Sequence, residues 1–107
     1  MRRFILFYLL TVSALFIYGD HPETLYKKGQ EALKSHRYEE AISLFTLAIR
    51  NYRESSGICL HCLYRDRGRA NCNLNRSNLA LSDLTRALEL DPKDPGGLAY
   101  YYRGLTY

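Results

Sequence analysis

Two stretches of the chain share one pattern of small and large residues, and this internal repeat constrains the fold more than any other feature. The first stretch reads "LYKKGQEALKSHRYEEAISLFTLAIRNYR" and the second "YRDRGRANCNLNRSNLALSDLTRALELDP". In each, a glycine is followed at offsets of 12, 16 and 19 residues by an alanine, a large apolar residue and a second alanine. These residues are Gly29, Ala41, Phe45 and Ala48 in the first stretch, and Gly68, Ala80, Leu84 and Ala87 in the second. Two copies of one structural unit are therefore expected.

The final residues repeat the start of the same unit. Gly104 follows Tyr100 by four residues, and the same step separates Leu25 from Gly29 and Tyr64 from Gly68. We therefore expect residues 97–107 to form the first helix of a third unit. In a repeat protein the outermost helix covers the apolar face beneath it, so this helix would shield the second repeat.

Periodicity identifies the units as helical. Apolar residues recur at spacings of three and four between residues 38 and 52, which gives one apolar stripe on a helix. Helices are expected at residues 22–35, 38–52, 58–74, 77–90 and 97–107, with Ser77 capping the fourth. A glycine inside a helix costs about 1 kcal/mol against alanine, so Gly29 and Gly68 at matching positions indicate close contact between helices.

These residues resemble the tetratricopeptide repeat (TPR), a unit of two antiparallel helices. "YEEAISLFTLAI" matches its second helix, and "LALSDLTRALELDP" matches it with Leu84 in place of an aromatic residue and with Pro92 as the closing proline. The resemblance implies an all-α, short TPR-like solenoid over residues 20–107, with repeats at about 22–55 and 61–94 and a half repeat at 97–107. The packing residues it implies are Gly29, Ala41, Phe45, Ala48, Gly68, Ala80, Leu84, Ala87, Pro92 and Gly104.

The N-terminal twenty residues have the layout of a secretory signal peptide. Arg2 and Arg3 precede an uncharged run from residue 4 to residue 18, and the small Gly19 follows. A fifteen-residue helix spans about 22 Å, which is short of a hydrocarbon core of about 30 Å. We expect residues 1–19 to be cleaved on export to a periplasmic or secreted location. The alternatives are a membrane anchor formed by residues 4–18 and a buried helix of the fold.

Charge and motifs argue against catalysis and against nucleic-acid binding. The net charge is +4, and loss of Arg2 and Arg3 leaves 13 basic and 11 acidic side chains. That surplus is too small for a nucleic-acid footprint. No glycine-rich phosphate loop, Ser-His-Asp set or nucleotide fingerprint occurs in the sequence. We therefore expect no enzyme and no cofactor.

The segment "CLHCLYRDRGRANC" holds three cysteines and a histidine. In a continuous helix Cys72 lies about 15 Å along the axis from Cys62, so the three thiols cannot reach one zinc ion. A thioredoxin-like redox site expects a preceding strand, which the pattern lacks. We expect no metal, and either a local Cys59–Cys62 disulfide formed in an oxidising compartment or buried thiols that pack as small apolar residues.

The TPR resemblance also implies a binding surface. In that family the first helix of each unit lines a concave groove that holds extended peptides, and some members hold acidic ends with basic and amide side chains. Carried over by repeat alignment, the groove residues are Tyr26, Gln30, Lys34, Arg65, Arg69, Asn73 and Tyr101. Arg65 and Arg69 are four apart and share a helical face. An ordinary solvated charged face is the alternative.

The expected function is thus that of an exported module that binds a protein or peptide partner, preferably an acidic one, in its concave groove. A structural subunit or the N-terminal fragment of a larger assembly, docking or self-associating through the tyrosine-rich last helix, is the alternative. Contact with a membrane is expected only if the N-terminal segment stays uncleaved.

Overall fold

The computed structural model describes residues 21–93, and within them the chain is entirely helical. Four α-helices follow one another: α2 (Pro22–Lys34), α3 (Tyr38–Arg50), α4 (Leu60–Asn73) and α5 (Ser77–Leu90). A short 3₁₀ turn, η1 (Glu54–Ser56), lies between α3 and α4. The predicted all-α repeat architecture is confirmed. The expected signal segment at 1–19 and the expected half repeat at 97–107 lie outside the described residues.

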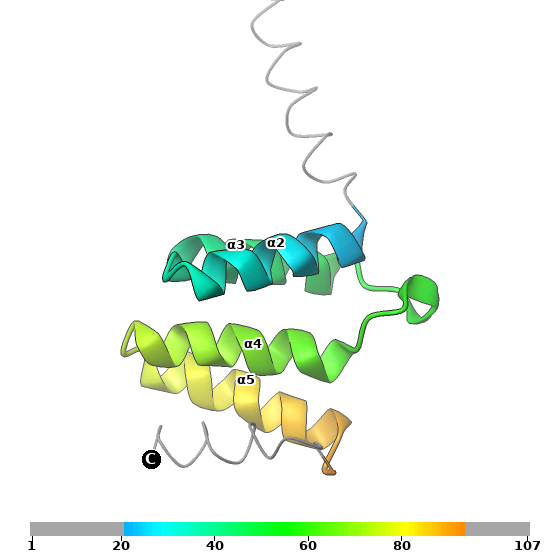
Figure 1. Ribbon diagram of the computed structural model, residues 1–107. Coiled ribbons are helices and arrows are strands. Elements are labelled where there is room, and N and C mark those ends of the chain that lie inside the picture. Colours follow the sequence, from blue (N-terminus) through cyan, green and yellow to red (C-terminus); the bar gives the residue numbers. More distant parts are fainter. Residues whose placement is uncertain (1–20, 94–107) are drawn as a thin grey trace, which may run out of the picture.

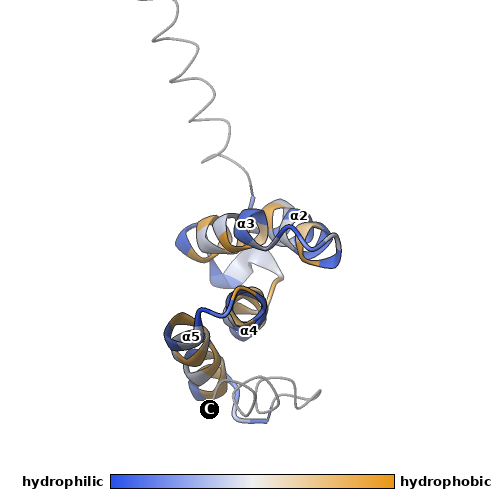
Figure 2. Ribbon diagram, turned by 90° about the vertical axis from the view of Figure 1, so that its left-hand side faces the viewer, coloured by the Kyte–Doolittle hydropathy of each residue, from blue (hydrophilic) through white to orange (hydrophobic). Residues whose placement is uncertain are grey.

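The helices form two antiparallel hairpins stacked on one another. Figure 1 shows the α2–α3 pair above the α4–α5 pair, joined at one end by the segment that contains η1. The view down the helices places α4 between the first pair and α5 (Figure 2). The first helix of the second unit therefore carries most of the contact between the two units, mainly against α3.

Both hairpins turn in the same way. His36 and Asn75 adopt the left-handed conformation, with φ of 61° and 58°. In the first turn the Arg37 amide donates to the Ala32 carbonyl at 2.8 Å, and in the second the Arg76 amide donates to the Asn71 carbonyl at 2.9 Å. A left-handed residue with this bonding pattern closes the C-terminus of a helix. The two units thus repeat in backbone geometry as well as in sequence.

Each unit is held by a glycine of its first helix packed against a large side chain of its second. A Cβ atom on Gly29 would lie 2.5 Å from Cε1 of Phe45, and one on Gly68 would lie 3.0 Å from Cδ2 of Leu84. Both large side chains are fully buried. The alanines at the repeat positions surround them and are buried as well: Ala41, Ala48, Ala80 and Ala87.

The core continues from the first unit into the second. Leu63 and Ala70 of α4 are buried in the same cluster as Leu25, Leu33 and Phe45 of the first hairpin. Removal of apolar surface from water stabilises a fold by about 25 cal/mol per Å². Burial of this shared cluster therefore holds the two units together. Neither hairpin could bury its apolar face alone.

The starts of two helices differ from the expectation. Helix α4 begins at Leu60 rather than at residue 58, because Cys59 adopts extended backbone and caps the helix, accepting the Cys62 amide. Ser77 is the first residue of α5 rather than its cap, and Arg76 occupies the cap position without a side-chain bond. Pro92 is exposed and lies just beyond the end of α5. Gly104 lies outside the described residues.

None of the helices within residues 21–93 has the length and apolar content needed to cross a lipid bilayer.

The contact between Gly29 and Phe45 gives a test of the fold. Gly29→Ala gains about 1 kcal/mol of helix propensity. The new methyl, however, meets a buried ring that has no free space to enter, and overpacking of this kind costs up to about 3 kcal/mol. The free energy of unfolding, measured by urea denaturation, should fall by about 1–2 kcal/mol.

Phe45→Leu provides the matched control for this substitution. The smaller side chain opens space beside residue 29, so the double variant should lose less stability than the sum of the two single variants. A Gly29→Ala protein as stable as the wild type would contradict the close contact.

Candidate functional site

A pocket of about 180 Å³ opens between α2 and α4, the first helices of the two units. Its lining residues are Gln30, Leu33, Lys34, Arg65, Asp66 and Arg69. Four of the seven predicted groove residues therefore meet in one place: Gln30, Lys34, Arg65 and Arg69. Gln30 and Lys34 are four residues apart on α2, and Arg65 and Arg69 are four residues apart on α4, so each pair lies on one face of its helix. The two faces border the same pocket.

The other three predicted groove residues differ. The Tyr26 hydroxyl donates to the Asp66 carboxylate at 2.9 Å, so it borders the pocket but already has a partner. Asn73 is exposed and donates to the Arg69 backbone carbonyl at 2.9 Å, which uses its amide within α4. Asn73 does not line the pocket. Tyr101 lies outside the described residues.

Sequence reasoning missed Asp66, the acidic member of this pocket. Its side chain is only 10% exposed and accepts hydrogen bonds from Tyr26 and from Nε of Arg65, the latter at 3.4 Å. A buried carboxylate needs such partners. The pocket therefore carries three cationic side chains against one carboxylate that already accepts two hydrogen bonds, and its field is positive. An acidic residue inside the basic run "RDRGR" is the signal that could have identified it.

The Tyr26–Asp66 bond links the two units across the pocket. Burial and the neighbouring Asp66 charge raise the pKa of Tyr26 to about 12. The ring also packs against Phe45, with centroids 6.0 Å apart. This tyrosine joins the pocket wall to the repeat core.

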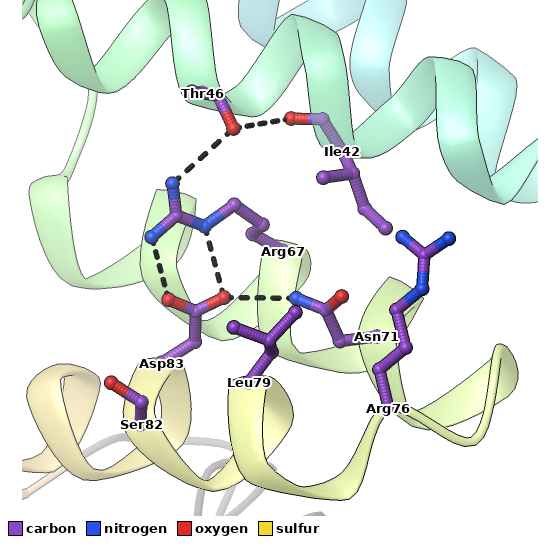
Figure 3. Close-up of a pocket in the computed structure, with 8 residues that line it drawn as sticks. All are labelled: Ile42, Thr46, Arg67, Asn71, Arg76, Leu79, Ser82 and Asp83. Carbon is purple, nitrogen blue, oxygen red and sulfur yellow. Dashed lines mark hydrogen bonds and ion pairs between the residues drawn. The ribbon is translucent and has the colours of Figure 1, made fainter.

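A second pocket, of about 280 Å³, lies between α3, α4 and α5 (Figure 3). Arg67 and Asp83 face each other in it and form two hydrogen bonds, of 2.9 Å from Nε and 2.6 Å from Nη2. Asn71 donates to the same carboxylate at 3.2 Å, and Arg67 also donates to Thr46 at 3.3 Å. These groups join three helices, so the network positions the second unit on the first.

This network accounts for residues that the sequence left without a role. Asp83 is buried, and its charge is balanced by Arg67, which also lies over the Tyr64 ring at 5.4 Å. Burial alone lowers the pKa of Arg67, but the hydrogen bonds and the charge of Asp83 outweigh it and raise that pKa. An acid on the apolar stripe of α5, between Ala80 and Leu84, is the sequence signal for such a buried pair.

The cysteine segment begins α4. Cys59 and Cys62 form a disulfide, and Cys72 lies half-buried outside it. His61 Nε2 lies 3.6 Å from Cys59 Sγ and 3.7 Å from Cys62 Sγ, and it also meets Asp91 at 3.3 Å. The proximity of Asp91, which arrives from the end of α5, was not predicted.

The fold defines a class of helical-repeat proteins with TPR-like antiparallel hairpins. Comparison with known proteins adds one relative, sperm-associated antigen 1 of Mus musculus, a TPR-containing protein that is 40% identical over 65 residues. The match covers 61% of this chain and 6% of the mouse protein. No protein-family model and no solved structure matches the chain. The similarity supports TPR-like helical repeats.

The raised pKa of Tyr26 predicts how stability depends on pH. The folded protein holds the Tyr26 proton up to a pH of about 12, whereas a tyrosine in an unfolded chain loses it near 10.0. The stability from this group is therefore complete below pH 10 and is lost as the pH rises towards 12.

Tyr26→Phe keeps the ring and removes the titrating hydroxyl. Its unfolding free energy, measured by urea denaturation at several pH values, should fall less steeply than that of the wild type between pH 10 and 12. Equal slopes for the two proteins would contradict the Tyr26–Asp66 bond.

Proposed function

We propose that this chain is a TPR-like protein-interaction module that holds an extended, acidic peptide between α2 and α4. The observation that carries the proposal is the convergence of Gln30, Lys34, Arg65 and Arg69 on one pocket. Two of these residues come from α2 and two from α4. A peptide in this position would contact both repeat units. The TPR-like similarity supports a protein partner.

The chemistry of the pocket favours carboxylates. Arginine presents a planar fork of donors that matches a carboxylate in a bidentate manner, and lysine adds a point charge. Arg65 is only 18% exposed, so its guanidinium is partly shielded from water and would contribute more to binding than an open surface charge. Leu33 gives the pocket an apolar wall for the stem of a side chain. The preferred ligand is a chain with alternating acidic and apolar residues, or a free C-terminal carboxylate.

A binding role is proposed rather than catalysis. The two buried carboxylates, Asp66 and Asp83, accept hydrogen bonds from Tyr26 and Arg67 and act as structural acceptors. General acid or base catalysis needs a group that can reach the substrate. Neither carboxylate is arranged in that way within the described residues.

A second candidate is a subunit that docks or self-associates through its C-terminal end. Leu79 and Leu90 of α5 are exposed, at 56% and 37%. Leu79 lines the pocket between α3, α4 and α5. Leu90 is the last residue of α5, where its side chain could pack on another chain. Gel filtration of the full chain distinguishes the candidates, because a groove binder elutes as a monomer and a self-associating subunit as a dimer or larger.

Export is proposed together with the binding role. The cationic start, the apolar run and the small residue at position 19 support a signal peptide. Mass spectrometry of the protein recovered from expressing cells should find a chain that starts at Asp20. An intact N-terminus on protein recovered outside the cytosol would contradict cleavage, and an intact chain retained in the membrane would support the anchor.

Charge reversal tests the groove. Arg65→Glu with Arg69→Glu should weaken binding of a fluorescent Glu- and Leu-containing peptide at least tenfold, which is about 1.4 kcal/mol, as measured by anisotropy. Since Arg65 contacts the buried Asp66, a second pair, Lys34→Glu with Arg69→Glu, makes the same change in net charge at exposed positions only. It should weaken binding by a similar factor.

The matched control is Arg50→Glu with Arg86→Glu, which alters the net charge equally on the exposed faces of α3 and α5. It should leave the affinity within about twofold of wild type once the salt concentration is fixed. All variants should keep the wild-type circular dichroism. If the control weakens binding as much as the groove pairs, the peptide is responding to net charge and the groove assignment fails.

A further inference from the structure

The start of α4 brings three metal-binding side chains together, and the end of α5 places an aspartate beside one of them. Cys59 and Cys62 lie in the cap and first turn of α4, His61 stands between them, and Asp91 is the C-cap residue of α5. The donor atoms of the two cysteines and the histidine lie within 4.8 Å of one another. Asp91 Oδ2 lies 3.3 Å from the same histidine nitrogen. Two sulfurs, one imidazole nitrogen and one carboxylate oxygen form a complete ligand set for zinc.

We propose that the reduced protein binds one Zn²⁺ through Cys59, His61, Cys62 and Asp91. Cys72 is not among these ligands. It is not needed, because the fold supplies Asp91 as the fourth ligand.

Three of the distances between donor atoms, all measured from His61 Nε2, fit a tetrahedral zinc ion. Zinc bonds of about 2.3 Å to sulfur and about 2.0–2.1 Å to nitrogen and oxygen, at tetrahedral angles, require sulfur–nitrogen separations of about 3.6 Å and nitrogen–oxygen separations of about 3.4 Å. His61 Nε2 lies 3.6 and 3.7 Å from the two sulfurs and 3.3 Å from Asp91 Oδ2. Asp91 Oδ2 must come closer to the sulfurs, because it is not within 4.8 Å of all three of the other donor atoms. The separation between the sulfurs must also widen, since the disulfide holds them together. Side-chain rotation can open it, since the two Cα atoms are 5.3 Å apart.

Neighbouring groups support these ligands. The Cys62 amide donates to Cys59 Sγ at 3.1 Å, and both cysteines lie at a helix N-terminus, where the aligned backbone dipoles stabilise a thiolate. The Lys93 amide donates to Asp91 Oδ1 at 3.0 Å, which orients the carboxylate with Oδ2 towards His61. Hydrogen bonds from neighbouring groups to the ligands hold the ligands in position before the metal binds. Side-chain exposures of 21% for His61 and 29% for Asp91 leave a path for the ion.

The disulfide and the zinc site exclude each other. A thiol reductant supplies two electrons and two protons, the Cys59–Cys62 bond breaks, two thiols form, and the reductant is oxidised to its own disulfide. Zinc then replaces the two thiol protons, which pass to solvent, and takes the lone pair of His61 Nε2 with the ring proton on Nδ1. Asp91 binds as the carboxylate. Thiolate sulfur selects zinc over magnesium or calcium, which prefer oxygen ligands.

Cobalt substitution of the full chain tests the site. The protein is reduced with a phosphine under nitrogen and titrated with Co²⁺. We expect one equivalent to bind with thiolate-to-cobalt charge-transfer absorption and the intense d–d bands of a tetrahedral ion, and Zn²⁺ to abolish both. The oxidised protein should show neither. Absence of these bands from the reduced protein would overturn the proposal.

Variants identify the ligands. Cys59→Ser should weaken the charge-transfer band, because one thiolate ligand is lost and Cys62 remains. Asp91→Ala and His61→Ala should each weaken Co²⁺ binding at least tenfold, since even changes to groups that contact the ligands cost about 10–100-fold. Cys72→Ser, the control, should bind as the wild type does. Asp91→Ala with unchanged affinity and spectrum would overturn the four-residue site. In the wild type, Zn²⁺ should also slow alkylation of Cys59 and Cys62 but not of Cys72, and loss of this protection in folded Asp91→Ala would be a second readout.

Discussion

The close approach of helices at Gly29 and Gly68 is the contact on which the rest of the structure depends. At each glycine a buried side chain, Phe45 or Leu84, occupies the space that a Cβ atom would fill. This allows the second helix of each unit to lie directly against the first. The spacing of α2 from α3 and of α4 from α5 follows. The two hairpins then stack, and the basic groups of α2 and α4 meet in one pocket.

Buried charges then fix one unit against the other. The Tyr26–Asp66 bond joins α2 to α4, and the Arg67–Asp83 pair joins α4 to α5 while Arg67 reaches Thr46 on α3. An apolar core alone tolerates sliding between stacked hairpins, whereas a buried acid hydrogen-bonded to a neighbouring helix does not. Removal of one member would leave an uncompensated charge, at a cost of about 3–5 kcal/mol. These buried pairs therefore hold the helices around the pocket in one arrangement.

The sequence predicted what depends on local spacing and missed what depends on tertiary contact. Helix positions followed from apolar spacings of three and four, and Arg65 and Arg69 were placed on one face by their separation of four residues. Local spacing could not identify Tyr26 as the partner of Asp66 or Arg67 as the partner of Asp83, because these pairs lie 40 and 16 residues apart in the chain. His36 and Asn75 adopt left-handed backbone although neither is a glycine, the residue that would have indicated such a turn in the sequence. The meeting of His61 with Asp91 requires the whole second hairpin.

The central claim is that the face formed by α2 and α4 receives an acidic peptide. Chemical-shift mapping of the isotope-labelled chain with the Glu- and Leu-containing peptide tests this directly. The account predicts that the largest amide shifts fall at Gln30, Lys34, Arg65 and Arg69, around the smaller pocket. Shifts centred instead on Arg76 and Ser82, beside the pocket between α3 and α5, would contradict it.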